Sequence, residues 1–141
     1  MYILDTDHLS LIRRNGAEGK RILAKLSTVA NSDVATTIVT YEEQTRGRFA
    51  VLGQAKTLDE VVRAYNGLQQ LVLDYQSIVI IAFDYNAALE HQRLRKQYPR
   101  LGNMDLKIAA IALTQQATLL TRNLADFAQI AKLLIENWAD P

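Results

Sequence analysis

The sequence contains no cysteine, and only two of its 141 residues are proline. Without cysteine the protein has no disulfide, no thiolate metal site and no cysteine nucleophile. With so little proline there is no proline-rich linker, and a chain of this length is expected to form one domain, spanning 1–141. Excess charge is also missing: the net charge is +1, so any surface that binds nucleic acid must be locally basic.

Long apolar runs and glycine-rich phosphate motifs are absent as well. No apolar stretch approaches the length of a membrane span, and Asp5 interrupts the N-terminal apolar run before a secretory signal could form. We therefore expect a cytoplasmic protein without membrane contact. The glycines form neither a Walker loop nor a dinucleotide-binding fingerprint, and Ser10 lacks the sequence context of a hydrolase nucleophile.

What the chain does contain is an alternation of short β-prone runs and amphipathic segments. The expected strands are 2–5, 34–39, 78–83, 118–121 and 133–135, with 78–83 apolar enough to be a buried parallel strand. The expected helices are 7–14, 18–29, 41–50, 55–74, 85–97, 104–116 and 124–131. This alternation predicts an α/β fold, a three-layer α/β/α sandwich around a central, mostly parallel sheet.

Three acidic residues occupy comparable places in this scheme. Asp5 ends the first strand, while Glu43 and Asp105 lie in the first turns of the helices after the second strand and after the Gly102 loop. In a parallel sheet these positions share one edge, so the three carboxylates can converge. Converging carboxylates raise one another's pKa and need a compensating cation. Oxygen ligands alone favour Mg²⁺ or Mn²⁺.

Each acid also has a simpler interpretation. Asp5 or Thr6 can serve as the N-cap of the next helix. Glu43 lies three residues after Thr40, which places the pair in the pattern of a capping box. Asp105 can merely complement the dipole of its helix. His8 and His91 have no partner at metal-ligand spacing and are expected at the surface or half-buried.

Basic residues flank two of these acids. One group follows Glu43 and the other precedes Asp105; together they comprise Arg46, Arg48, Arg93, Arg95, Lys96 and Arg100. They form either solvated helix faces or cations that position the backbone of a nucleic-acid substrate.

Four segments of the chain, in order, resemble PIN-domain ribonucleases, particularly the VapC-type toxins of bacterial toxin–antitoxin pairs. They are Tyr-Ile-Leu-Asp-Thr-Asp-His-Leu-Ser at 2–10, Thr-Ile-Val-Thr-Tyr-Glu-Glu-Gln-Thr-Arg-Gly at 37–47, Gly-Asn-Met-Asp-Leu-Lys-Ile-Ala-Ala-Ile-Ala-Leu at 102–113 and Leu-Leu-Thr-Arg-Asn-Leu-Ala-Asp-Phe at 119–127. Any one segment is a weak signal, but the set of four is specific and spans nearly the whole chain.

The resemblance implies a metal-dependent endoribonuclease with an acidic core of Asp5, Glu43 and Asp105. It also implies a homodimer, an RNA substrate and a cognate antitoxin. Gly47 would be the family's helix glycine, kept for close packing. Some relatives carry an acid where this chain has Asn123. The side chains expected to support the core are Thr6, Asp7, Thr121, Asn123 and Asp126.

Two other functions are compatible with the same residues. Asp5 and Asp7 after an apolar strand also resemble the start of haloacid-dehalogenase-type phosphatases, in which the first Asp is a nucleophile and the second a general acid. Against this, 141 residues is short for that fold. Alternatively, the acidic pocket belongs to a non-catalytic interaction module that docks a basic partner.

Overall fold

The structure, a computed structural model, describes all 141 residues, with five strands and seven α-helices. The strands are β1 (Tyr2–Leu4), β2 (Val34–Thr37), β3 (Val79–Ile81), β4 (Thr118–Leu120) and β5 (Leu134–Glu136). The helices are α1 (Thr6–Arg14), α2 (Ala17–Leu26), α3 (Ile38–Gln54), α4 (Leu58–Tyr75), α5 (Tyr85–Gln97), α6 (Asn103–Thr114) and α7 (Leu124–Phe127), and a 3₁₀ turn at Asn31–Asp33 precedes β2.

The strands form a single sheet in the order β3-β2-β1-β4-β5, and every neighbouring pair is parallel. The central strand β1 pairs with β2 on one side and with β4 on the other, with Ile3 opposite both Ala35 and Leu119. Because all strands run the same way, their carboxyl ends lie along one edge, where ligands of such sheets bind.

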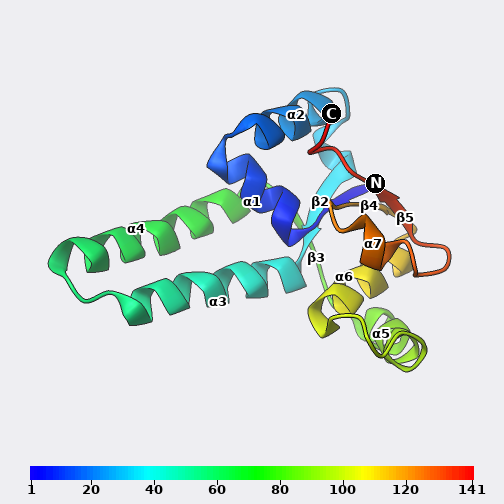
Figure 1. Ribbon diagram of the computed structural model, residues 1–141. Coiled ribbons are helices and arrows are strands. Elements are labelled where there is room, and N and C mark those ends of the chain that lie inside the picture. The colour runs from blue at the N-terminus through cyan, green and yellow to red at the C-terminus, as the bar shows by residue number, and fades with distance from the viewer.

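Alternate side chains of the central strands enter two separate cores, one on each face of the sheet. Ile3 and Leu119 pack with α5 and α6 in the larger core, whereas Leu4 and Leu120 pack with α1 and α2 in the smaller one. Figure 1 shows the two helical layers on opposite sides of the sheet. The predicted three-layer α/β/α architecture is therefore confirmed.

Two expectations about the strands and helices were wrong. The β-branched run 34–39 does not remain a strand: helix α3 begins at Ile38, because the Thr37 hydroxyl accepts the backbone N–H of Thr40 at 3.1 Å. Thr37, and not Thr40, is the N-cap. The apolar run 78–83 is not a buried strand either, because β3 lies at the edge of the sheet and leaves Val79 half-exposed.

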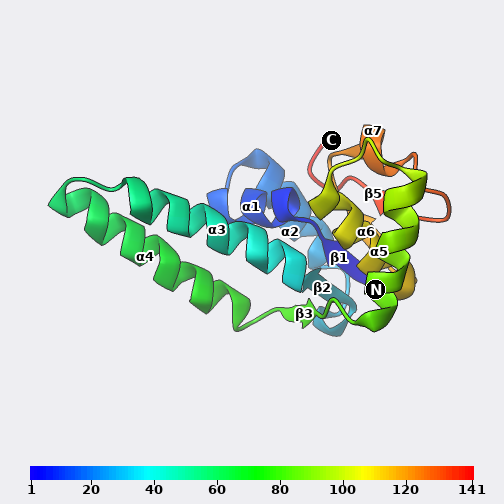
Figure 2. The ribbon, with the colours of Figure 1, turned by 90° about the horizontal axis from the view of Figure 1, so that it is seen from below.

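Helices α3 and α4 form a long hairpin that projects beyond the β3 edge of the sheet (Figures 1 and 2). Its outer residues include the exposed apolar side chains Phe49, Leu58 and Tyr65. Gly47 lies on this hairpin, and a Cβ atom added there would meet no atom of this chain within 4 Å. The expected close packing at Gly47 is thus absent from the chain itself.

None of the helices combines the length and the apolar character that a membrane-spanning helix needs.

Candidate active site

Asp5 stands where the central strand ends and the first helix begins, and it serves both elements. Its backbone N–H donates to Leu120 O of β4 at 3.1 Å, while its Oδ1 caps α1 by accepting the His8 N–H at 2.8 Å. The side chain is buried, and burial is the main reason that its pKa rises from 3.8 to about 6. The His8 N–H and the Thr121 hydroxyl lower this pKa, and repulsion from Asp7 and Asp105 raises it.

Glu43 comes from the second turn of α3, and it does not close a capping box as the sequence had suggested. Its Oε1 accepts a 2.6 Å hydrogen bond from the hydroxyl of Thr6, the residue after Asp5. The same hydroxyl lies 3.2 Å from Thr40 Oγ1. These contacts attach Glu43 to the carboxyl end of β1, so the second acid reaches the sheet edge from a longer helix than expected.

Asp105 lies in the first turn of α6, as predicted, and is partly buried. Burial raises its pKa above the ordinary value, and the negative charges of Glu43 and Asp126 raise it further. Asp126 is held in turn by the Asn123 amide, which donates to its Oδ2 at 3.0 Å. These repulsions place Asp105 near Asp5, Glu43 and Asp126 at the carboxyl edge of the sheet, although no three of these four acids bring their ligand atoms within 4.8 Å of one another.

Thr121 and Asn123 extend this edge from the end of β4. Thr121 is fully buried, and its hydroxyl accepts the backbone N–H of Asn123 at 3.0 Å. The Asn123 side chain contacts Asp126 and therefore reaches the acidic core through a neighbouring acid.

Asp7 lies beside Asp5 but is held by a cation. Arg122 donates from Nε and from one terminal nitrogen to the two Asp7 oxygens, at 2.6 and 2.9 Å. Because Arg122 occupies both carboxylate oxygens of Asp7, neither oxygen faces a substrate as the phosphatase alternative requires. Sequence reasoning missed Arg122, although its position directly after β4 places it at the edge that carries the acids.

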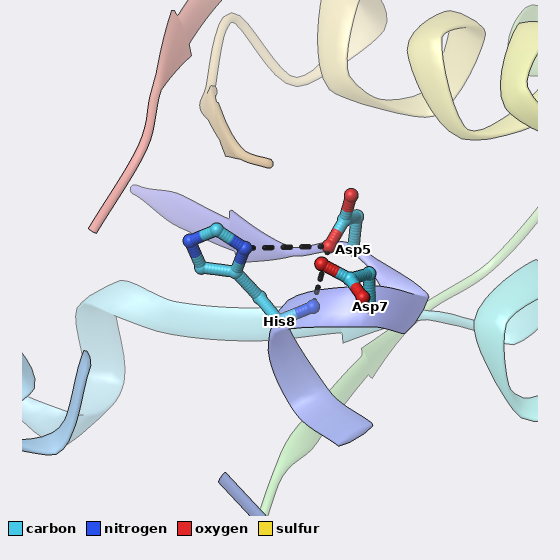
Figure 3. A group of neighbouring side chains, drawn as sticks. All are labelled: Asp5, Asp7 and His8. Carbon is cyan, nitrogen blue, oxygen red and sulfur yellow. Dashed lines mark hydrogen bonds and ion pairs between the residues drawn. The ribbon is translucent and has the colours of Figure 1, made fainter. Parts of the chain in front are cut away.

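His8 is completely buried, contrary to the expectation of a surface or half-buried histidine. The imidazole points toward the Asp5 carboxylate, with Nδ1 3.6 Å from Oδ1 (Figure 3). Burial lowers the pKa of His8 from 6.5 to about 4, so the ring is neutral near pH 7. Asp5, Asp7 and His8 each place one ligand-type atom within 4.8 Å of the others, a grouping that can hold a metal ion. The sequence signal for this proximity was the three-residue spacing of Asp5 and His8, which places both side chains at the N-terminus of one helix.

His91, the other histidine, is partly buried.

None of the six predicted basic residues forms a hydrogen bond or ion pair with the three core acids. Arg46 pairs with Glu42 on its own helix, the Arg48 guanidinium lies against Gly67 of α4, and Arg93 pairs with Glu90. The remaining three, Arg95, Lys96 and Arg100, are exposed. Their contact with RNA stays a prediction.

Comparison with curated proteins finds relatives along the whole chain. The ribonuclease VapC1 of Haemophilus influenzae strain R2866 is 28% identical over 139 residues, which cover 98% of each protein. The ribonuclease VapC2 of Rickettsia felis is 36% identical over 63 residues, covering 42% of this chain and 47% of the relative.

Solved structures share the fold. The VapBC-1 structure from nontypeable Haemophilus influenzae superposes with a TM-score of 0.78 at 23% identity, covering 99% of this chain and 98% of that one. The VapBC2 structure from Rickettsia felis, bound to a promoter DNA fragment, gives a TM-score of 0.73 at 24% identity, with 97% and 98% covered. The family model for the PIN domain matches residues 2–133, so this chain belongs to the PIN domain family.

Proposed function

We propose that this protein is a metal-dependent endoribonuclease that hydrolyses RNA phosphodiester bonds and acts in the cytoplasm as the toxin of a toxin–antitoxin pair. The observation that carries the proposal is the convergence of Asp5, Glu43 and Asp105 at the carboxyl edge of a PIN-domain sheet. The VapC relatives, which are named ribonucleases, support RNA as the substrate.

The acidic core fits a hard divalent cation. Its donors are carboxylate oxygens, and repulsion from neighbouring acids adds to burial in raising the pKa values of Asp5 and Asp105, which supports a bound cation there. Such donors suit Mg²⁺ or Mn²⁺. Asp5 and Asp105 would hold the cation, and Glu43 would complete the site or orient the attacking water. When bound, the cation supplies Lewis acidity and lowers the pKa of water.

The surrounding residues keep this core in place. Thr6 fixes the Glu43 carboxylate, Thr121 contacts Asp5, and Asn123 orients Asp126. Arg122 pairs with Asp7 beside Asp5 and is a candidate, with the six basic residues named above, for binding RNA phosphates. On binding RNA, Arg122 would then exchange its ion pair with Asp7 for one with a phosphate of the substrate.

The proposed partners are a cognate antitoxin and a second copy of this chain. Solved neighbours with the same fold include VapBC complexes, which supports an antitoxin. This chain offers an apolar groove of about 850 Å³ between α1, α2 and the end of α4, lined by side chains that include Leu9, Ile12, Leu23 and Leu26. We propose that the antitoxin occupies this groove. An antitoxin cation that paired with Asp5 and Asp105 would displace the metal.

The test is cleavage of a panel of labelled RNAs with Mg²⁺ or Mn²⁺, with excess chelator, and with Asp5→Asn and Asp105→Asn. Cleavage is expected only for the wild type with metal. Cleavage that survives in both variants would contradict the assignment of the site. Absence of both cleavage and Mn²⁺ binding in the wild type would refute the nuclease and favour the interaction module.

A further inference from the structure

His8 is the one ionisable side chain that is fully buried beside the acidic core, and the roles proposed so far do not use it. It lies in the first turn of α1, three residues after Asp5. One ring nitrogen, Nε2, faces the backbone N–H of Trp138. The other, Nδ1, faces the Asp5 carboxylate (Figure 3). The ring therefore lies between Asp5, at the end of β1, and Trp138, in the segment after β5.

The contact with Trp138 determines which nitrogen carries the proton. The Trp138 backbone N–H donates to His8 Nε2 at 3.2 Å. A peptide N–H cannot accept, so Nε2 must present a lone pair and has no proton. The single proton of the imidazole is then on Nδ1, the nitrogen that faces Asp5.

The Nδ1–H group has Asp5 as its available acceptor. Nδ1 is buried without a hydrogen-bond partner, and Asp5 Oδ1 lies 3.6 Å away. That distance is an electrostatic contact and is too long for a formed N–H···O hydrogen bond. Asp5 Oδ1 already accepts the His8 backbone N–H at 2.8 Å. Both N–H groups of one residue thus converge on Oδ1, while the other Asp5 oxygen points away from the ring (Figure 3).

We propose that His8 is a positioning residue for Asp5: its Nδ1–H attracts Oδ1 and so directs the second carboxylate oxygen away from the ring, toward the cation. The inference rests on the proposed function of Asp5 as a metal ligand. Donors that orient a ligating carboxylate in this way tune metal affinity without touching the metal.

The segment after β5 sets the tautomer of His8. Trp138 is buried and packs against Tyr2, with ring centroids 4.8 Å apart and the ring planes tilted by 49°. The next residue, Ala139, is anchored by Arg21 of α2, whose Nε donates to its carbonyl oxygen at 2.6 Å. These contacts fix the Trp138 N–H, so a residue 130 positions from His8 in the sequence determines which ring nitrogen addresses Asp5.

The hydrogen bond from Trp138 to Nε2 also makes His8 unsuited to bind a metal. Ligation through Nδ1 would require the proton to move to Nε2, where it would face the Trp138 N–H and leave two donors opposed. His8 is consequently assigned as a donor to Asp5, although the Asp5–Asp7–His8 group has ligand-like spacing.

Two substitutions separate the two ring nitrogens. In His8→Asn the amide reaches the place of Nδ1 and can still donate to Asp5. In His8→Gln the longer side chain reaches the place of Nε2 and can still accept from Trp138. Both variants remove the buried ring, so both are expected to lower the thermal unfolding midpoint. For Mn²⁺ affinity measured by calorimetry, we expect His8→Gln to weaken binding by roughly 10- to 100-fold and His8→Asn to change it little.

A purely structural role predicts instead that Mn²⁺ affinity follows the unfolding midpoint in both variants, and equal losses would overturn the proposal. The second measurement needs no variant: ¹⁵N chemical shifts of the wild-type imidazole report which nitrogen is protonated, and we expect Nδ1 with and without Mg²⁺. A proton on Nε2, or its transfer there on adding Mg²⁺, would overturn the assignment. Failure of the proposed function is distinguishable, because the wild type would then bind no metal while the nitrogen shifts still decide the His8–Asp5 contact.

Discussion

Replacing Asp5 by Asn is expected to stabilise the metal-free protein at neutral pH, although it removes a proposed metal ligand. In the folded protein the pKa of Asp5 is about 6, against 3.8 ordinarily. Keeping Asp5 ionised at pH 7.5 therefore costs about 3 kcal/mol relative to the unfolded chain. Asparagine avoids this cost, and its Oδ1 can still cap α1 by accepting the His8 N–H.

The expected gain in the free energy of unfolding is roughly 1 to 3 kcal/mol at pH 7.5, because Asn must still find a partner for its amide hydrogens. The sign follows from proton uptake: between pH 3.8 and about 6 the folded wild type binds a proton at Asp5 that the unfolded chain does not. Wild-type stability from Asp5 is thus fully present below pH 3.8 and is lost as the pH rises through 6. The advantage of Asp5→Asn should vanish near pH 4.

Urea unfolding in excess chelator at pH 7.5 and pH 4, with the exposed Asp33→Asn as control, measures this difference. Comparison of variant with wild type is essential, because the pKa of His8 is lowered from 6.5 to about 4 and its contribution has the opposite sign in the same interval. Saturating Mn²⁺ should reverse the order by stabilising only the wild type. A variant that is less stable than the wild type at pH 7.5 in chelator, or a gain independent of pH, would refute the reasoning.

Three further changes test other contacts. Thr6→Val removes the hydroxyl that holds Glu43 and should weaken Mn²⁺ binding about tenfold or more, while Thr6→Ser should retain it; equal affinities in calorimetry would contradict a supporting role. Arg122→Ala breaks an exposed ion pair and should cost less than about 1 kcal/mol of stability, yet raise the KM for RNA and reduce its salt dependence; an unchanged KM would remove Arg122 from the RNA site. Gly19→Ala would place a Cβ atom against a backbone oxygen of α1 and should lower the free energy of unfolding by about 1 to 3 kcal/mol. Gly47→Ala meets no obstruction and should raise the free energy of unfolding by about 1 kcal/mol. Equal shifts of the thermal unfolding midpoint in the two variants would contradict this packing.

The fold was predictable because its signals are local. Period-two and period-3.6 patterns distinguish strands from helices, and their alternation implies parallel pairing. The start of α3 was not predictable from the β-branched run 34–39, because propensity there favours a strand and the Thr37 hydroxyl decides the boundary. The edge position of β3 depends on strand order, which the apolar content of 78–83 does not encode.

That Asp5, Glu43 and Asp105 lie at the same edge of the sheet was predictable for a topological reason: strand ends and the helix starts that follow them share one edge of a parallel sheet. Contacts over long sequence separations were not. The burial of His8 depends on Trp138, and the pairing of Asp7 depends on Arg122, 115 residues away. Such contacts form only when distant segments come together in the folded protein, so no local sequence pattern predicts them.

The pairing of β1 with β4 has a consequence for when the protein can become active during its synthesis. Tyr2 is in register with Thr118, and the backbone N–H of Asp5 is bonded to Leu120. During synthesis β1 therefore cannot pair with β4 until β4 has left the ribosome. Contacts of such long sequence separation also form slowly. A partly translated chain lacks the strand that anchors Asp5, so the proposed nuclease activity would arise only after residue 120 has emerged from the ribosome.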